Sequence, residues 1–299
     1  MANVLILGTV ALDSIETPFG RIKDAVGGSA TYSSIAASFF SKPRILSIVG
    51  RDFPKEHMDY FKKKGIDTSG ISTGNKTFRW EGFYEFDMNQ AKTLKTELNV
   101  LETYKVDMPD SYRDSEYLFL GNIDPELQLD VINGINKPKL IVMDTMNFWI
   151  EHRKEQLLRT IKKADVLVFN DGEARELFQT PNLVKAANEA LKLVSTAVII
   201  KKGEHGSLLF TKGRHFSAPS FPLESIKDPT GCGDVFGGAF TGYLAKTDDI
   251  SEKNMRKAMV YGSVLASYNA EGFGTEMLKK IDHTDIEKRY KAFKEIREF

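Results

Sequence analysis

Short, almost wholly apolar runs alternate with helix-like stretches along this chain, and this alternation most constrains its fold. An apolar run without polar alternation is typical of a strand buried on both faces. The runs lie at residues 4–8, 45–49, 117–120, 140–143, 166–169, 197–200 and 208–210. The helix-like stretches lie at residues 29–40, 55–64, 156–163, 183–193 and 236–245. The pattern predicts an α/β layered fold with a mainly parallel sheet and right-handed crossovers.

One segment departs from this pattern. Between residues 77 and 87, Phe78, Trp80, Tyr84 and Phe86 alternate with charged residues, which is typical of a strand with one wet face. A polar strand is expected at residues 91–98, and an extended piece at 14–23 contains a Pro-Phe-Gly turn. These segments predict a small separate sheet that covers a site or pairs with another subunit. The alternative is an ordinary solvent-facing sheet edge.

Composition narrows the class of protein. The 299 residues include 41 Lys plus Arg and 41 Asp plus Glu, so the net charge of zero gives no electrostatic case for nucleic acid or an anionic membrane. The single cysteine, Cys232, excludes an intrachain disulfide framework and suits a reducing compartment. Neither a signal-peptide pattern nor a membrane-spanning apolar run is present in the sequence. We therefore expect one cytoplasmic domain spanning residues 1–299.

Residues 227–240 carry the clearest chemical signal. Gly231 and Gly233 permit a tight turn and close approach of a ligand, and a helical pattern begins directly after them. A glycine turn that opens a helix presents free N–H groups and the positive end of the helix dipole, which together favour an anion. Asp234 lies inside this turn. It is either a base that accepts a proton from an attacking hydroxyl or a simple helix N-cap.

This stretch, 228-DPTGCGD-234, resembles the DTTGAGD signature of the ribokinase (phosphofructokinase-B, PfkB) family of sugar and nucleoside kinases. Further segments match the family's motifs in order along nearly the whole chain. They are 8-GTVALD-13, 26-VGGSA-30, 49-VGRD-52 with 65-GIDTSG-70, 170-NDGE-173 and 202-KGEHG-206. The resemblance implies a three-layer α/β/α fold with a mainly parallel central sheet. It also implies a small β-sheet lid formed by residues 14–26 and 75–105, which makes the dimer contact in several members.

The resemblance implies a role for each matching residue. Asp234 would be the catalytic base, and the N–H groups of Gly231, Cys232 and Gly233 would hold the transferred phosphoryl group. The acceptor would be bound by Asp13, Gly27, Gly28, Tyr32, Arg79 and Asp234. ATP would be bound by Asn170, Lys201, Gly203, Gly206, Gly231, Gly233 and Gly274. Mg²⁺ would be held by Glu173 through water, and a monovalent cation such as K⁺ by Asp228.

Several of these positions keep a plainer alternative. Glu173 is also a favoured carboxylate at a helix N-terminus, and Gly27 and Gly28 suit an ordinary turn. Arg79 can be an exposed lid charge, and the aromatic residues of the lid can serve packing alone. The sequence also departs from the family pattern, because Lys201 stands where the family often has threonine. Cys232 and Pro229 replace the usual alanine and threonine.

The resemblance implies an ATP- and Mg²⁺-dependent kinase that phosphorylates a hydroxymethyl group of a small sugar, polyol or sugar-like compound. A nucleoside kinase of the same family is the alternative, because an aromatic lid can stack on a nucleobase. A non-catalytic binding protein on the same scaffold is a remote third. The sequence leaves open which sugar or nucleoside is the substrate.

Overall fold

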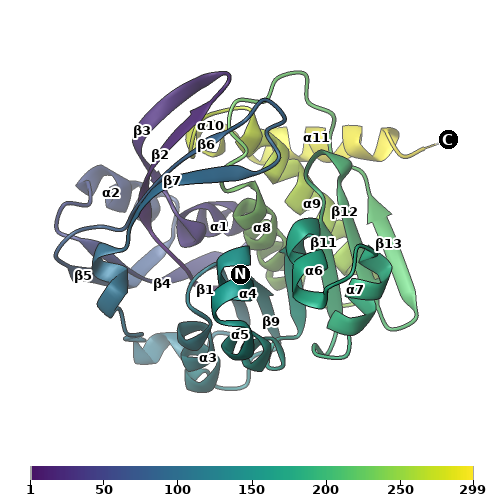
Figure 1. The fold of residues 1–299 in the computed structure, drawn as a ribbon, viewed down its shortest axis with the longest axis horizontal. Helices are drawn as coiled ribbons and strands as arrows, with labels where there is room; N and C mark the ends of the chain where they lie inside the picture. The colour runs from purple at the N-terminus through teal and green to yellow at the C-terminus, as the bar shows by residue number, and fades with distance from the viewer. Residues whose placement is uncertain (1, 299) are drawn as a thin grey trace.

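A nine-stranded sheet forms the centre of the molecule (Figure 1). The structure, a computed structural model, describes residues 2–298. The strand order is β13-β12-β11-β10-β9-β8-β1-β4-β5, and all neighbours from β11 to β5 pair in parallel. Only β12 and β13 are antiparallel. The bounds are β1 (Asn3–Leu7), β4 (Lys42–Gly50), β5 (Asp67–Gly74), β8 (Tyr117–Leu120), β9 (Leu140–Asp144), β10 (Val166–Asn170), β11 (Ala197–Lys201), β12 (Ser207–Thr211) and β13 (Arg214–Ala218).

Helices cover both faces of this sheet, because successive residues of each strand point to opposite sides. In β1, Val4 and Ile6 belong to one apolar core, and Leu5 and Leu7 belong to the other. The first core is covered by α1 (Ser29–Ser38), α2 (Lys55–Lys63), α8 (Cys232–Thr247), α9 (Glu252–Ala270), α10 (Glu276–Lys280) and α11 (His283–Glu295). The second is covered by α3 (Pro125–Gly134), α4 (Asn147–His152), α5 (Lys154–Ile161), α6 (Asp171–Phe178) and α7 (Leu183–Ala190).

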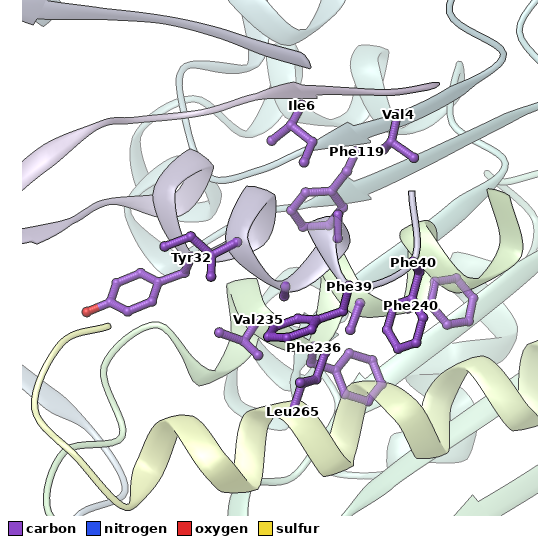
Figure 2. Packing of buried hydrophobic residues seen from close by; sticks show 14 of the residues in the cluster. Val4, Ile6, Tyr32, Phe39, Phe40, Phe119, Val235, Phe236, Phe240 and Leu265 are labelled. Atoms are coloured by element: carbon purple, nitrogen blue, oxygen red, sulfur yellow. The ribbon is translucent and has the colours of Figure 1, made fainter. Parts of the chain in front are cut away.

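The first core brings α1 and α8 together beneath the sheet. Figure 2 shows Ile6 and Phe119 of the sheet above Phe236 of α8. Gly238 is required on α8, because a Cβ there would lie 2.1 Å from the carbonyl oxygen of Ser33 in α1. This close approach of the two backbones fixes the N-terminus of α8 beside the start of α1.

A second sheet stands apart from the first (Figure 1). Its order is β3-β2-β6-β7, formed by β2 (Ala11–Thr17), β3 (Gly20–Gly27), β6 (Arg79–Tyr84) and β7 (Ala91–Glu97). The sequence predicted a small sheet from these two parts of the chain. It was wrong about the end of the aromatic stripe, because β6 stops at Tyr84 and Phe86 is 85% exposed in the following turn. We call this four-stranded sheet the lid.

The three-layer α/β/α fold with a mainly parallel sheet is confirmed. Several elements were not predicted, among them β5, β13 and the long helix α9. Three short 3₁₀ helices complete the chain, η1 (Asn99–Thr103), η2 (Asp110–Tyr112) and η3 (Gly203–His205). Over residues 2–298, none of the helices combines the length and the apolar character that crossing a bilayer requires.

The strand order predicts a binding site at the carboxyl-terminal ends of the strands of the main sheet, which we call the site edge of the sheet. From β1 the chain proceeds to β4 and β5 on one side, and later to β8, β9, β10 and β11 on the other. In open α/β sheets, ligands bind at the carboxyl ends of the strands next to such a reversal. The N-terminus of α8 and the lid both meet the main sheet at this edge.

Candidate active site

The loop before α8 and the first turn of that helix form an anion-binding corner. The first helical hydrogen bond of α8 runs from the Val235 N–H to the Gly231 carbonyl at 2.8 Å. The Cys232 N–H instead donates to the Pro229 carbonyl at 3.1 Å, so this predicted donor is already engaged. Within residues 2–298, the N–H groups of Gly231, Gly233 and Asp234 have no backbone acceptor. These three groups, at the positive end of a 16-residue helix, are the donors left for an anion.

Gly231 is required by both conformation and space. Its φ of +76° is costly for residues with a side chain, and a Cβ would lie 2.4 Å from the ring of Tyr32. Tyr32 is 1% exposed, and its hydroxyl has no partner among the described residues. Figure 2 shows this hydroxyl pointing away from the apolar cluster. Tyr32 therefore supports the loop with its ring and keeps a polar atom at the edge of the site.

Cys232 packs as a small apolar residue. Its Sγ lies 3.4 Å from the Ala266 carbonyl oxygen of α9. Burial raises the pKa of the Cys232 thiol to about 12. A thiol that stays protonated is a poor nucleophile and is hard to oxidise, which fits a packing role.

Asp234 is half-buried in the first turn of α8. Burial and the carboxylate of Asp144 raise the pKa of Asp234 to about 7, and the Lys201 ammonium opposes this rise. A carboxyl that titrates near neutral pH is suited to exchanging a proton with a substrate. Asp234 is not the N-cap of α8, because Gly231 occupies the N-cap position and Asp234 lies within the first turn of the helix.

Lys201 and Asp144 form a buried ion pair beside this turn. Lys201 ends β11, Asp144 ends β9, and Lys201 Nζ lies 2.7 Å from Asp144 Oδ2. Their side chains are only 17% and 5% exposed. Burial disfavours the ammonium, but the carboxylates of Asp144 and Glu173 outweigh burial and raise the pKa of Lys201. A Cβ on Gly233 would lie 2.9 Å from Lys201 Nζ, so the ammonium lies against the anion-binding corner.

Asn170 and Glu173 begin α6 with a reciprocal capping box. The Asn170 side chain accepts the Glu173 N–H at 2.8 Å, and Glu173 Oε2 accepts the Asn170 N–H at 2.6 Å. The helix-capping role of Glu173 is therefore compatible with a role in holding Mg²⁺, because capping uses Oε2 and leaves Oε1 available. Burial raises the pKa of Glu173 to about 8, with Lys201 opposing and Asp144 adding to the rise.

Asp13 lies across the site on the lid strand β2. It is 5% exposed, and its Oδ2 accepts the Gly28 N–H at 3.2 Å. Burial raises the pKa of Asp13 to about 7; the Gly28 hydrogen bond opposes this rise, and the charges of Asp228 and Asp234 add to it. A Cβ on Gly27 would lie 1.9 Å from Asp13 Oδ2. Gly27 is thus required so that the carboxylate can lie flat against the backbone before α1.

Asp228 orders the loops around the corner. It is fully buried, with Oδ1 accepting the Thr230 N–H at 2.9 Å and Oδ2 accepting the Gly274 N–H at 3.0 Å. Both oxygens are therefore engaged by backbone donors. This geometry joins the loop before α8 to the segment after α9.

The predicted nucleotide-binding glycines lie in turns at the same edge. Gly203, Gly206 and Gly274 all have positive φ values, and a Cβ on Gly206 would lie 2.1 Å from the Ala218 carbonyl oxygen. The turn between β6 and β7 extends over this region. Its Asn89 side chain lies 3.9 Å from the Cβ position of Gly203, and Gln90 lies 3.9 Å from that of Gly172.

The inner face of the lid carries the aromatic residues. Trp80 of β6 pairs with Asp13 of β2, and paired residues of neighbouring strands share a face. Tyr84 follows on that face, and its hydroxyl accepts a hydrogen bond from Thr230 Oγ1 at 3.1 Å. The lid thus contacts the loop before α8 directly.

Arg79 lies on the opposite face of the lid. It follows the alternation of β6 and is paired with Asp24 and, at 3.2 Å, with Asp52. Both ion pairs would have to break before Arg79 could reach an acceptor beside Asp13. The structure therefore does not bring Arg79 together with the other predicted acceptor-binding residues.

Sequence reasoning missed Asp144. The residue directly follows the apolar run 140–143, and a carboxylate at the carboxyl end of a buried strand was the available signal. The role of Asp144 depends on its partner Lys201, which is distant in the sequence. The two side chains meet because β9 and β11 lie on either side of β10 in the sheet.

Comparison with known proteins assigns the family. The model of the pfkB family of carbohydrate kinases matches residues 133–280, which include the β9 to β11 edge and the corner before α8. This chain belongs to the pfkB family. The kinase is 27% identical over 246 residues to a cytidine kinase of Thermococcus kodakarensis, covering 80% of this chain and 87% of that protein.

Solved structures show that the fold of this pfkB-family kinase is shared. The nucleoside kinase of Methanocaldococcus jannaschii, an archaeal member of the ribokinase family, superposes with a TM-score of 0.78 at 22% identity and covers 98% of this chain and 99% of its own. A ribokinase II candidate from E. coli in complex with ATP and Mg²⁺ superposes with a TM-score of 0.79 at 17% identity, covering 98% and 100%.

The donor set at this edge fits a magnesium nucleotide. Residues 2–298 contain no cluster of three or more His, Cys, Asp or Glu side chains arranged around a metal position. Mg²⁺ with nucleotide phosphates needs only one or two protein carboxylates and fills its other positions with water and phosphate oxygens. Glu173 meets this need, because it is buried and one of its oxygens is not used by the capping box.

Proposed function

We propose that this kinase phosphorylates the 5′-hydroxymethyl group of a nucleoside with ATP and Mg²⁺. The observation that carries the proposal is the position of Asp234, half-buried beside the free Gly233 N–H in the first turn of α8. Bound ATP supplies the phosphoryl group. The acceptor oxygen bonds to the γ-phosphorus, the bond from that phosphorus to the bridging oxygen of ADP breaks, and Asp234 takes the hydroxyl proton.

The other residues hold the two reactants. Asp13 accepts hydrogen bonds from two acceptor hydroxyls, which suits the vicinal diol of a ribose. The Gly231, Gly233 and Asp234 N–H groups hold the transferred phosphoryl group, and Glu173 holds Mg²⁺ through water. Phosphoryl transfer depends mainly on such positioning and charge stabilisation.

A nucleoside is favoured over a free sugar by the lid. Trp80 and Tyr84 share the face of the lid on which Asp13 lies, so an aromatic surface is available to a base attached to the sugar. The relatives named cytidine kinase and nucleoside kinase support the same acceptor class. A free sugar remains the competing acceptor, since the matching family model describes carbohydrate kinases.

The test measures ADP release from ATP and Mg²⁺ with a panel of nucleosides, free sugars, sugar acids, sugar phosphates and polyols. We expect a nucleoside to give the largest rate, with a nucleoside 5′-monophosphate as the product by mass spectrometry. A larger rate with ribose or another sugar would replace the nucleoside by that acceptor. If no compound of the panel stimulates ADP release, the proposed kinase activity is contradicted, and a non-catalytic binding protein becomes the favoured function.

Two variants test the base. Asp234→Asn should abolish acceptor phosphorylation while ADP still binds, because the amide cannot take the proton. Asp59→Asn, on the exposed surface of α2, is the matched control and should turn over like the wild type. Retained turnover by Asp234→Asn would contradict the role of this carboxylate.

We further propose that the lid pairs with a second copy of this chain. Apolar side chains are exposed on it, with Phe19 57%, Phe86 85% and Leu94 59% exposed. Sedimentation velocity on the wild type and on a Phe86→Ser variant tests this homodimer. The cytoplasmic location and the use of a monovalent cation at Asp228 stay predictions.

A further inference from the structure

Lys201 brings a full positive charge into the candidate site. The family often has a neutral threonine at this position. The residue ends β11 and pairs with Asn170 of β10, while Asp144 of β9 pairs with Val168, two residues before Asn170, so the side chains of Lys201, Asn170 and Asp144 point to the same face of the sheet. That face is covered by α8. The strand register therefore directs the ammonium at the N-terminus of α8.

The surroundings of this ammonium show what it is placed for. Lys201 Nζ lies within 2.9 Å of the Cβ position of Gly233, whose N–H has no backbone acceptor within residues 2–298. A cation at the positive end of a helix is repelled by the helix dipole. An anion that contacts both positive groups would stabilise them together.

Asp144 meets this requirement only in part. It neutralises Lys201 across a distance of 2.7 Å, but it ends β9 and makes its other hydrogen bond to the Thr145 N–H at 2.9 Å. It makes no hydrogen bond to Gly233 or Asp234 among the described residues. The N–H of Gly233 and the ammonium of Lys201 thus face the same space without a shared anion.

We propose that Lys201 is a catalytic residue of the proposed phosphoryl transfer, whose ammonium contacts the transferred phosphoryl group together with the Gly233 N–H, and that Asp144 is the positioning residue that holds it there. This role rests on the proposed function. Charge on the phosphoryl oxygens is spread over three equatorial positions in the transition state, and a fixed cation on one of them stabilises it. A lysine provides this as a compact point charge, which threonine cannot do.

The competing explanation is a purely structural ion pair. Removing only Lys201 would leave Asp144 buried and unpaired, which by itself destabilises a protein strongly. The decisive variant is therefore the neutral pair Lys201→Met/Asp144→Asn, which removes both charges together. Lys201→Thr, with the residue frequent in the family at this position, is the second variant in case the pair does not fold. Lys192→Met/Glu189→Gln on the exposed surface is the matched control.

The measurements are thermal unfolding, the rate of acceptor phosphorylation, and calorimetric binding of ADP and of a non-hydrolysable ATP analogue. We expect the neutral pair to unfold near the wild-type temperature and to turn over about 100- to 1,000-fold more slowly, the loss typical for one removed donor to a developing charge. Its affinity should fall at least tenfold for the ATP analogue and less than threefold for ADP, because only the analogue has the third phosphate. The surface control should match the wild type in every measurement.

Turnover within threefold of the wild type in either folded variant would overturn the role of Lys201 while leaving the kinase intact. An equal loss of affinity for ADP and the ATP analogue would also overturn it, because the contact would then be to the other phosphates. A wild type that phosphorylates no compound of the panel would instead remove the proposed function, and this role with it.

Discussion

Replacing Gly27 by alanine is a sharp test of how Asp13 is positioned. The added Cβ would lie 1.9 Å from Oδ2 and 2.6 Å from Cγ of Asp13. An ordinary contact begins at 3.4 Å, so the carboxylate has to move by about 1.5 Å. Gly27 is not among the glycines with positive φ, so the substitution adds a clash without backbone strain.

The magnitude follows from what the displaced carboxylate would lose. Hydrogen bonds to a charged group contribute about 1.5–3 kcal/mol each, and a carboxylate that binds a diol makes two of them. Losing about 3 kcal/mol of acceptor binding in the transition state corresponds to roughly a 100-fold fall in kcat/KM. The same factor is typical of a misplacement by about 1 Å in an active site.

The assay compares kcat/KM for the acceptor with the affinity for ADP. Gly27→Ala should lower the first about 100-fold and leave the second within twofold, because Asp13 is on the lid and not in the predicted nucleotide turns. Gly134→Ala at the end of α3 is the control, since Gly134 is not among the glycines with positive φ and the nearest atom to its Cβ position is the terminal methyl of Met108, the end of a flexible side chain. A Gly27→Ala enzyme within threefold of the wild type for the acceptor would refute the assignment of Asp13.

Two further predictions use the electrostatics of the site and its contact with the lid. Burial raises the pKa values of Asp234 and Asp13 to about 7, and both carboxyls act in the ionised form, so kcat/KM should rise with pH through about 7 and then level off. A profile that is flat between about pH 5.5 and 8.5 would rule this out. Tyr84→Phe removes the hydrogen bond from Thr230, worth about 1 kcal/mol, and should lower kcat/KM about fivefold while raising ADP release without acceptor. An unchanged ratio of ADP to phosphorylated product would show that this contact does not close the site.

The buried strands could be predicted from sequence because of their environment. Strands covered on both faces are apolar throughout, so β1, β8, β9, β10 and β11 stand out as runs. By contrast, β5 is an edge strand with the sequence DTSGISTG, which has no such run. Its identification required knowledge of its partner β4.

Helix α9 shows a different limit. It has 19 residues and buries polar side chains such as Asn254, Ser267 and Asn269. Asn269 donates to the Thr230 carbonyl at 2.8 Å, so its burial serves the loop before α8 and does not follow an apolar stripe. Periodicity alone does not detect a helix whose buried face is partly polar.

Arg79 was assigned to the acceptor although its own strand pattern already separated it from Trp80 and Tyr84. The alternation of β6 showed that Arg79 faces away from the aromatic residues, but which face meets Asp13 depends on the parallel pairing of β6 with β2. That pairing joins residues 67 positions apart in the sequence, a separation that local pattern does not resolve. Placement on the lid was therefore predictable, and placement in the site was not.

The charges around Lys201 also influence the protonation state of Asp234. Asp144, Glu173 and Asp234 surround a single ammonium, and burial raises the pKa of Glu173 to about 8 and of Asp234 to about 7. At neutral pH these carboxyls are therefore partly protonated, and a protonated Asp234 cannot accept the proton of a hydroxyl. Lys201 opposes this rise directly, so the residue that departs from the family pattern also helps to keep Asp234 in its reactive form. The variant Lys201→Thr lacks the ammonium, so its pH–rate midpoint should lie at higher pH than that of the wild type.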